Sequence, residues 1–230
     1  MRSFEIVISR YNEPLEWTLT TPFVFYKYIV YNKGLNDNFE KSRVSKTIQL
    51  DNVGKEVHTY LYHIIQNYDS LSEIVIFLPA SMAVFYKSEK ALALLEIIAR
   101  RNFEYAFFPG QQTESVKSYF ENFEIDYWKS TTKENQEGND YSLLPSPVRP
   151  FGKWYEYNFP NKQTHWWSYN CVFSVDRRDI LQHSKEYYMN LLKGVSTANN
   201  AEEGHYIERS WEAVFGPFTY TQPTYQRMNY

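Results

Sequence analysis

Two short motifs, far apart in the sequence, combine carboxylates, a histidine and a glycine with an apolar helical pattern. They span residues 50–61 and 202–211. The first opens a predicted helix directly after a strand-like run, where free backbone N–H groups can hold an anion. The second gathers acids, which can act as a general base or as metal ligands. We expect the two motifs to form parts of one site.

The elements that would position these motifs alternate between strands and helices. β-branched, aromatic or apolar runs predict strands at residues 5–9, 25–31, 47–50 and 74–78. Apolar residues at helical spacing predict helices at 55–68 and 88–101. This alternation is typical of βαβ units, so it predicts an α/β fold with a mostly parallel sheet.

Residues 102–168 have a different composition and predict an irregular, aromatic-rich insertion. Pro109-Gly110 and Pro145-Ser146-Pro147 interrupt any long element, and we expect one short helix near 114–123. Order resumes with a strand at 169–175. Helices at 178–193 and 203–215 should then pack back on the same sheet.

Polar residues at three places should meet at one edge of this sheet. Two groups follow predicted strands directly, and the third opens the first helix; they are Tyr11-Asn12-Glu13, Pro79-Ala80-Ser81 and Asn52-Val53-Gly54-Lys55-Glu56. Open α/β sheets bind ligands outside the carboxyl ends of their strands. An aromatic ring such as Tyr11 can stack on a base, and Lys55 offers charge to a phosphate. The structural alternatives are an ordinary turn and an ordinary capped helix start.

Other candidate residues also have structural alternatives. His58 and His63 lie five residues apart on one helix and are expected to be surface or packing residues. Glu203 in the first turn of a helix would also complement the helix dipole. Glu208 lies one turn after His205, on the same side of that helix.

The composition excludes several classes of protein. A net charge of −3 gives no electrostatic reason for nucleic acid as the main partner. The single cysteine, Cys171, excludes an intrachain disulfide and a cysteine-rich zinc site. No run approaches the roughly 20 apolar residues of a membrane span. We therefore expect a soluble cytoplasmic protein, in the host cytoplasm if the source is viral.

Three blocks of the sequence together resemble a known family. Residues 11–13 with Trp17, residues 50–61 and residues 202–211 look like domain of unknown function 3431, which occurs in bacteria, fungi, plants and large DNA viruses. The order and spacing of the blocks make this resemblance fairly specific, but the family name implies no activity.

A more distant resemblance implies an activity. Residues 52–56 are similar to the Asn-x-Gly-Arg-Asp block of polysaccharide glycosyltransferases of the GT-A fold. This similarity implies a nucleotide-diphospho-sugar, Rossmann-like sheet flanked by helices in one domain over 1–230. Its parts would be a nucleotide-binding half (1–101), the insertion (102–168) and an acceptor-side half (169–230). The implied nucleotide-binding residues are Tyr11, Asn12, Glu13, Asn52, Gly54, Lys55 and Glu56.

The sequence departs from the GT-A pattern at two positions. Pro79-Ala80-Ser81-Met82 stands where Asp-x-Asp is expected, so no acid is present there to hold a metal. Lys55 replaces the expected arginine, which keeps the charge but loses bidentate phosphate binding. Two alternatives follow. Manganese or magnesium would be a cofactor, with His205 as a candidate ligand, or Lys55 and other cations would stabilise the diphosphate without metal.

The resemblance leads us to expect a glycosyltransferase that moves a sugar from a nucleotide-sugar donor to a glycan or another hydroxyl acceptor. It places Glu202, Glu203 and His205 on the acceptor and metal side. Glu203 is the first candidate for the catalytic base, followed by Glu208. The expected acceptor-binding residues are Trp154, His165, Trp166 and Trp167. The alternatives are a non-catalytic nucleotide- or carbohydrate-binding module and a structural protein of the same fold.

Overall fold

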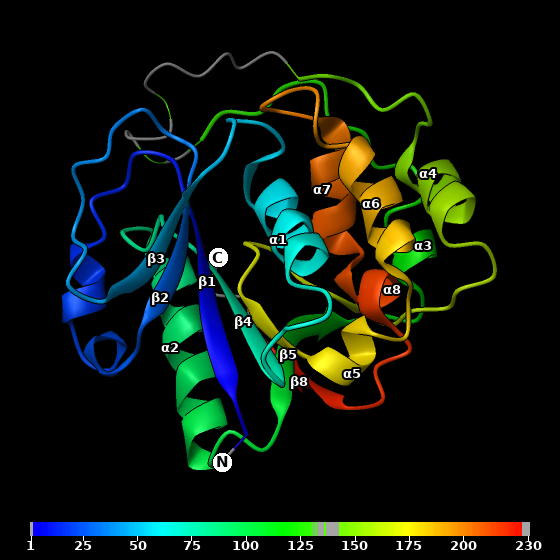
Figure 1. Cartoon of the computed structure of the whole chain (residues 1–230). Coiled ribbons are helices and arrows are strands. Elements are labelled where there is room, and N and C mark those ends of the chain that lie inside the picture. The colour runs from blue at the N-terminus through cyan, green and yellow to red at the C-terminus, as the bar shows by residue number, and fades with distance from the viewer. Residues whose placement is uncertain (1, 131, 133–135, 137–142, 227–230) are drawn as a thin grey trace.

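A five-stranded mixed sheet forms the centre of the computed structural model, which describes residues 2–130, 132, 136 and 143–226 (Figure 1). The strand order is β3-β2-β1-β4-β7. Its first four strands are mutually parallel, and β7 pairs antiparallel with β4. The strands are β1 (Phe4–Arg10), β2 (Tyr28–Asn32), β3 (Val44–Gln49), β4 (Ile74–Pro79) and β7 (Phe173–Asp176). The predicted α/β class with a mostly parallel sheet is confirmed.

Alternating strand residues build a hydrophobic core on each face of the sheet. Val7, Val75 and Phe77 belong to one buried cluster, whereas Ile6 and Ile76 belong to the other. Figure 1 shows most helices on one side of the sheet and α2 on the other. The first cluster includes residues of α1 (Lys55–Gln66), α6 (Lys185–Lys193), α7 (Glu202–Arg209) and α8 (Trp211–Phe215), and the second includes residues of α2 (Phe85–Arg100).

The described part of 102–168 is more regular than its composition predicts. It contains β5 (Ala106–Gln112), α3 (Val116–Tyr119), α4 (Phe151–Asn158) and β6 (Trp166–Trp167), and β5 lies between β6 and β8 (Thr221–Tyr225) in a second sheet. Pro109 does not break β5. It has no N–H to donate, but the edge of the strand on which that N–H would lie contacts serine side chains instead of another strand. The Phe107 N–H donates to Ser174 Oγ, and Ser168 Oγ donates to the Pro109 carbonyl. The prediction of an irregular insertion is therefore wrong here; residues 131, 133–135 and 137–142 lie outside the description.

Two predicted helices are each divided. The helix expected at 178–193 is α5 (Arg177–Ile180) followed by α6, whose N-cap Ser184 accepts from the Tyr187 N–H. The final helix is interrupted at Ser210, where Oγ donates back to the Tyr206 carbonyl. Two short 3₁₀ helices, η1 (Glu16–Leu19) and η2 (Phe23–Phe25), lie in the connection between β1 and β2.

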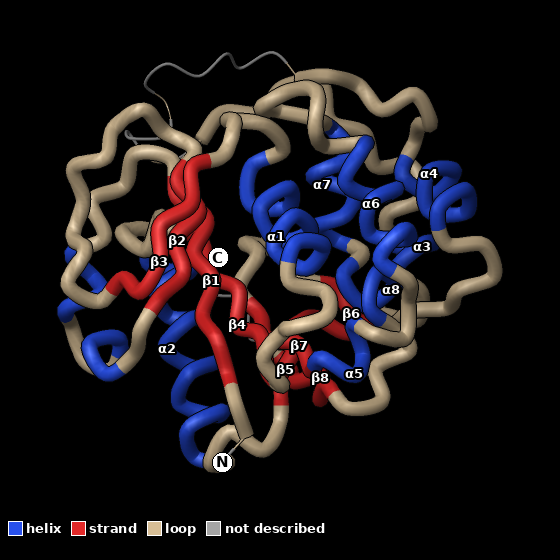
Figure 2. Tube along the Cα trace, in the orientation of Figure 1, coloured by secondary structure: helices blue, strands red, loops and turns tan. Residues whose placement is uncertain are grey.

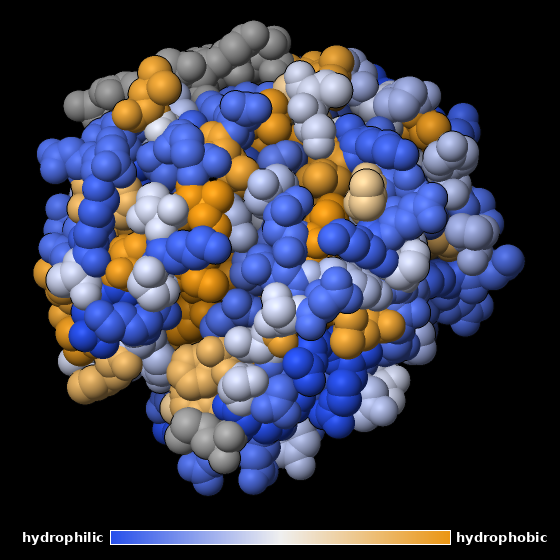
Figure 3. All heavy atoms as spheres, in the orientation of Figure 1, coloured by the Kyte–Doolittle hydropathy of each residue, from blue (hydrophilic) through white to orange (hydrophobic). Residues whose placement is uncertain are grey.

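Much of the aromatic content is inside the protein. Trp154, Tyr206 and Trp211 are fully or almost fully buried, and they contact other rings of the same cluster. The face drawn in Figure 3 is mainly hydrophilic, with apolar residues in separate groups. Among the described residues, no helix has both the length and the apolar character needed to cross a membrane.

Candidate functional site

A cavity of about 340 Å³ lies at the carboxyl ends of the parallel strands. Its walls come from the end of β1, the start of α1, residues 123–130, residues 169–171 and the start of α7. Figure 2 shows the loops that follow the parallel strands gathered at one end of the sheet, where α1 also begins. This is the edge at which the sequence predicted a site.

The start of α1 forms one wall and needs glycine at its N-cap. Gly54 has a φ of 55°, and a Cβ there would lie 2.2 Å from the Val195 carbonyl oxygen. The Gly54 N–H donates to the Ala198 carbonyl at 2.8 Å, which ties this turn to the loop before α7. Among the described residues, the N–H groups of Lys55, Glu56 and Val57 have no acceptor, as expected for the first turn of a helix.

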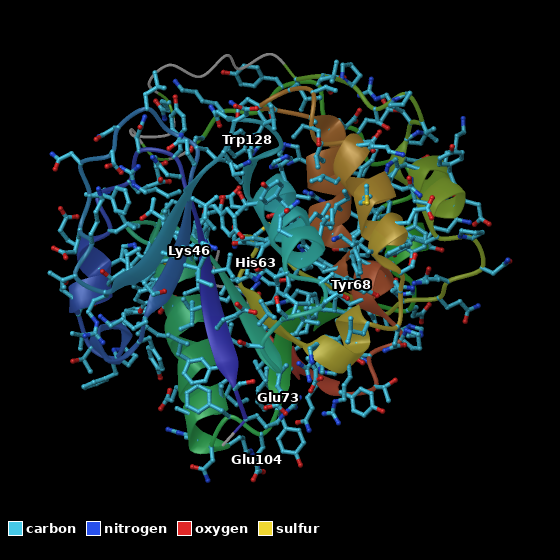
Figure 4. All side chains as sticks on the ribbon, in the orientation of Figure 1. Lys46, His63, Tyr68, Glu73, Glu104 and Trp128 are labelled. Atoms are coloured by element: carbon cyan, nitrogen blue, oxygen red, sulfur yellow. The ribbon has the colours of Figure 1, made fainter. Side chains whose placement is uncertain are left out.

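Lys55 crosses from α1 to the opposite wall of the cavity. Its Nζ donates to Asn200 Oδ1 at 2.7 Å and lies 3.1 Å from the centre of the Trp128 ring. Burial lowers the pKa of Lys55 to about 7. Figure 4 labels Trp128 near the start of α1. Trp128 lines the cavity, and its isolated position in a loop gave no sequence pattern that would identify it.

Two more lysines line the cavity near the start of α1. Lys33 Nζ donates to the Lys55 carbonyl at 2.7 Å and to the Val53 carbonyl, and burial lowers its pKa to about 7. Lys87 Nζ lies 3.9 Å from Glu56 Oε1. The positive end of a helix dipole thus has three lysines beside it, an arrangement that an anion would stabilise.

The turn after β1 forms a further wall, as predicted. Tyr11 and Glu13 line the cavity, and the Tyr11 N–H donates to Glu13 Oε2 at 2.8 Å. Arg10 also lines it; its Nε donates to the Glu13 carbonyl, and burial lowers its pKa. Asn52, Gly54, Lys55 and Glu56 are lining residues as well, whereas Asn12 is not.

The second motif contributes His205 and Glu208 to the cavity. The Asn170 N–H donates to Glu208 Oε1 at 2.6 Å, and Glu208 Oε2 lies 3.7 Å from Arg209 Nη1. His205 Nε2 is 3.3 Å from Asn200 Oδ1. Burial, followed by the charges of Lys55 and Arg209, holds the pKa of His205 well below its ordinary value. Its imidazole is therefore neutral at pH 7 and a weak base.

Glu203 and its neighbour Glu202 lie away from the cavity lining. Glu203 Oε1 accepts from Ser146 Oγ at 3.2 Å. The Glu202 carboxylate is fully buried and accepts from the Ile125 N–H, the Ser146 N–H, Tyr206 Oη and Arg149 Nε. Glu202 therefore holds chain segments together, and of the three carboxylates on α7 Glu208 is the one that lines the cavity.

The expected acceptor-binding residues also lie outside the cavity lining. Trp154 and Trp167 are 1% and 3% exposed and pack in the core. The His165 and Trp166 N–H groups both donate to Glu212 Oε2, at the join of α8 and β6. Trp166 is half-buried against the same core and His165 is exposed, so none of the four lines the cavity, and their acceptor-binding role stays a prediction. The aromatic residues that line the cavity are Tyr11, Tyr86, Phe123, Trp128 and Tyr169.

The chemistry of the lining residues favours an anion over a divalent metal ion. In the described part of the chain, no three His, Cys, Asp or Glu side chains come together as a metal site. Ala80 and Ser81, which stand where the Asp-x-Asp motif was expected, follow β4, are buried and offer no carboxylate to a metal ion. The basic residues of the lining are Arg10, Lys33, Lys55, Lys87, Lys129 and Arg209, and the acids are Glu13, Glu56 and Glu208.

Comparison with known proteins identifies the family without adding an activity. No curated protein matches the chain. The family model described as "Protein of unknown function (DUF3431)" matches residues 6–228, nearly the whole sequence. The chain therefore belongs to the DUF3431 family.

Proposed function

We propose that this protein is a glycosyltransferase of GT-A-like fold that uses a nucleotide-sugar donor. The observation that carries the proposal is the cavity itself. A helix N-terminus, three lysines, aromatic rings and the Glu208 carboxylate line one space at the carboxyl ends of parallel strands. A ligand with a diphosphate, a base and a sugar matches this combination of charge and aromatic surface.

The diphosphate would lie against the start of α1. Lysines and the positive end of a helix dipole repel each other, and a bound anion would offset this repulsion. The free N–H groups of the first turn and the ammonium groups of Lys33, Lys55 and Lys87 would together stabilise the charge that develops on the departing diphosphate. Tyr11, at the end of β1, would stack on the nucleobase.

Glu208 is the proposed general base. It would take the proton from the acceptor hydroxyl while that oxygen bonds to the anomeric carbon and the bond from that carbon to the diphosphate breaks. The Asn170 N–H fixes one carboxylate oxygen, and the other lies on the cavity side of α7 with Arg209 3.7 Å away. His205 is the weaker candidate, because its low pKa favours the neutral, poorly basic ring.

No step of this proposal passes through a metal ion. A manganese or magnesium ion would stabilise the same diphosphate charge, but the described residues beside the start of α1 are mostly cations. Cationic side chains would repel a divalent ion and attract the diphosphate itself. The lysines therefore provide the required positive charge.

A thermal-shift panel tests the proposal. The full chain would be heated with nucleoside diphosphates, their sugar conjugates and the matching nucleosides, in EDTA and with manganese. We expect at least one nucleoside diphosphate to raise the melting temperature more than its nucleoside. If no nucleoside diphosphate changes the melting temperature, the proposal fails.

The competing function is a binding module of the same fold. The observation that favours it is Glu208, whose Oε1 already accepts a hydrogen bond of 2.6 Å from the Asn170 N–H. Such a module would bind nucleoside diphosphates and sugar nucleotides but release no product from them. Turnover, measured alongside binding, separates the two functions.

A further inference from the structure

Lys87 projects from the first turn of α2 into the cavity at the point where β4 ends. Its Nζ donates to Ser81 Oγ at 2.8 Å, and Ser81 lies two residues after the end of β4. The Lys87 side chain is 15% exposed, so it is held in place yet reachable from the cavity. A lysine here sits beside the residues that stand where an Asp-x-Asp motif was expected.

The surroundings of Lys87 leave it donors for a ligand. An ammonium group has three N–H donors. Within the described residues, Ser81 Oγ is the one acceptor at hydrogen-bond distance of Nζ, and Glu56 Oε1 lies farther away at 3.9 Å. The lysine charge is also close enough to act on Lys55 and Cys171 across the cavity.

The location of the charge is unfavourable without a ligand. Lys87 lies in the first turn of α2, which has no acidic residue. Lys55 opens α1, and the side chain of Lys33, which follows β2, reaches the same place. Two positive helix ends and three lysines thus face one space, and within the described ranges Glu56 is the one acid in contact with Lys87.

We propose that Lys87 is the fixed cation that binds the diphosphate at the end of β4, in the place a divalent metal would otherwise take. This inference rests on the proposed function and specifies how the site works. Ser81 holds the ammonium group in position, and two of its N–H donors reach phosphate oxygens. No bond to Lys87 forms or breaks; the lysine stabilises charge on the leaving group.

Isothermal titration of the full chain with inorganic pyrophosphate in EDTA tests this role, because pyrophosphate needs no knowledge of the base. The variants are Lys87→Met, Lys87→Arg and Ser81→Ala. The control is Lys46→Met, an exposed lysine on β3 labelled in Figure 4. Melting curves of each variant verify that it is folded.

We expect wild type and Lys46→Met to bind pyrophosphate equally without metal. Lys87→Met should bind at least roughly 10- to 100-fold more weakly, because it removes the charged hydrogen bonds from the ammonium group to the phosphate oxygens. Lys87→Arg should retain most of the affinity, and Ser81→Ala should lose less than Lys87→Met. Equal binding by wild type and Lys87→Met would overturn the inference about Lys87 but not the proposed function.

Two further results would also overturn it. If wild type binds pyrophosphate only after manganese is added, a metal rather than Lys87 serves the diphosphate, but the proposed glycosyltransferase survives. If wild type binds neither pyrophosphate nor any nucleoside diphosphate under either condition, the proposed function fails together with the inference.

Discussion

Lys55 Nζ donates a hydrogen bond of 2.7 Å to Asn200 Oδ1, joining segments 145 residues apart in the chain. Lys55 belongs to the first chemical motif, and Asn200 immediately precedes the second. Their contact crosses the cavity and brings His205, which shares Asn200 as a partner, to the same wall. The two motifs therefore form one site.

Replacing Lys55 should weaken binding of a diphosphate. Lys55→Met removes a charged donor at the cavity wall, so we expect a loss of about 1.5–3 kcal/mol in binding free energy. Because burial lowers the pKa of Lys55 to about 7, the wild-type ammonium loses its proton as the pH rises above 7. Affinity should fall over that range. Lys55→Arg keeps its charge and should show a flatter pH profile; equal slopes in a calorimetric titration would contradict this.

Two glycines at the site should respond oppositely to alanine. At Gly54, φ is positive and a Cβ would meet the Val195 carbonyl oxygen at 2.2 Å, so Gly54→Ala should lower the free energy of unfolding by more than about 1 kcal/mol. At Gly204, inside α7, a Cβ would lie 3.9 Å from Val195 Cγ1, an ordinary van der Waals distance. Gly204→Ala should therefore stabilise by about 0.5–1 kcal/mol. Urea denaturation measures both, and a shift of the same sign would refute the comparison.

Glu202 and Glu203 form a matched pair on α7. Glu202→Gln puts an amide donor among the Ile125 N–H, the Ser146 N–H and Arg149, and should cost about 1.5–3 kcal/mol of unfolding free energy. Glu203→Gln affects one hydrogen bond, from Ser146 Oγ, and its free energy of unfolding should stay within about 0.5 kcal/mol of wild type. Hydrogen exchange at Ile125 and Ser146 should speed up only in Glu202→Gln. Equal stability of both variants would show that the Glu202 contacts carry little energy.

Glu208→Gln should separate turnover from binding. A general base contributes about 10²–10⁴-fold to the rate, so transfer should fall by that factor while nucleotide affinity changes little. Glu203→Gln is the control, since Glu203 lies outside the cavity lining and should keep wild-type transfer. If Glu203→Gln lost transfer and Glu208→Gln did not, the base would have been assigned to the wrong carboxylate.

Strand periodicity and the strand-end rule predicted the half of the site that comes before residue 101. The patterns of β1 and β3 placed Tyr11 and Lys55 at the same edge, because parallel strands end at one edge. The strand β5 was missed, since Pro109-Gly110 normally ends a strand. Here the edge of β5 that carries Pro109 contacts serine side chains rather than a backbone partner, so the absent proline N–H costs no ladder bond.

The second half of the site depends on contacts that the sequence does not encode locally. Their spacing predicts that His205 and Glu208 lie on one side of α7, but it does not predict which side of the helix faces the cavity. Trp128 has no periodic context, and its place in the wall depends on contacts with Lys55 and His205, which are distant in the sequence. Trp166 and Trp167 were expected to bind an acceptor, yet Trp167 is buried in the core.

The most direct test of the central claim is release of nucleoside diphosphate from a panel of sugar nucleotides by the full wild-type chain. The assay would run with glycan acceptors and with none, in EDTA. We predict that one donor gives steady release, that an acceptor accelerates it, and that Glu208→Gln slows it about 10²–10⁴-fold. Tight binding of a sugar nucleotide with no release from any donor, with or without manganese, would contradict a transferase and establish a binding module.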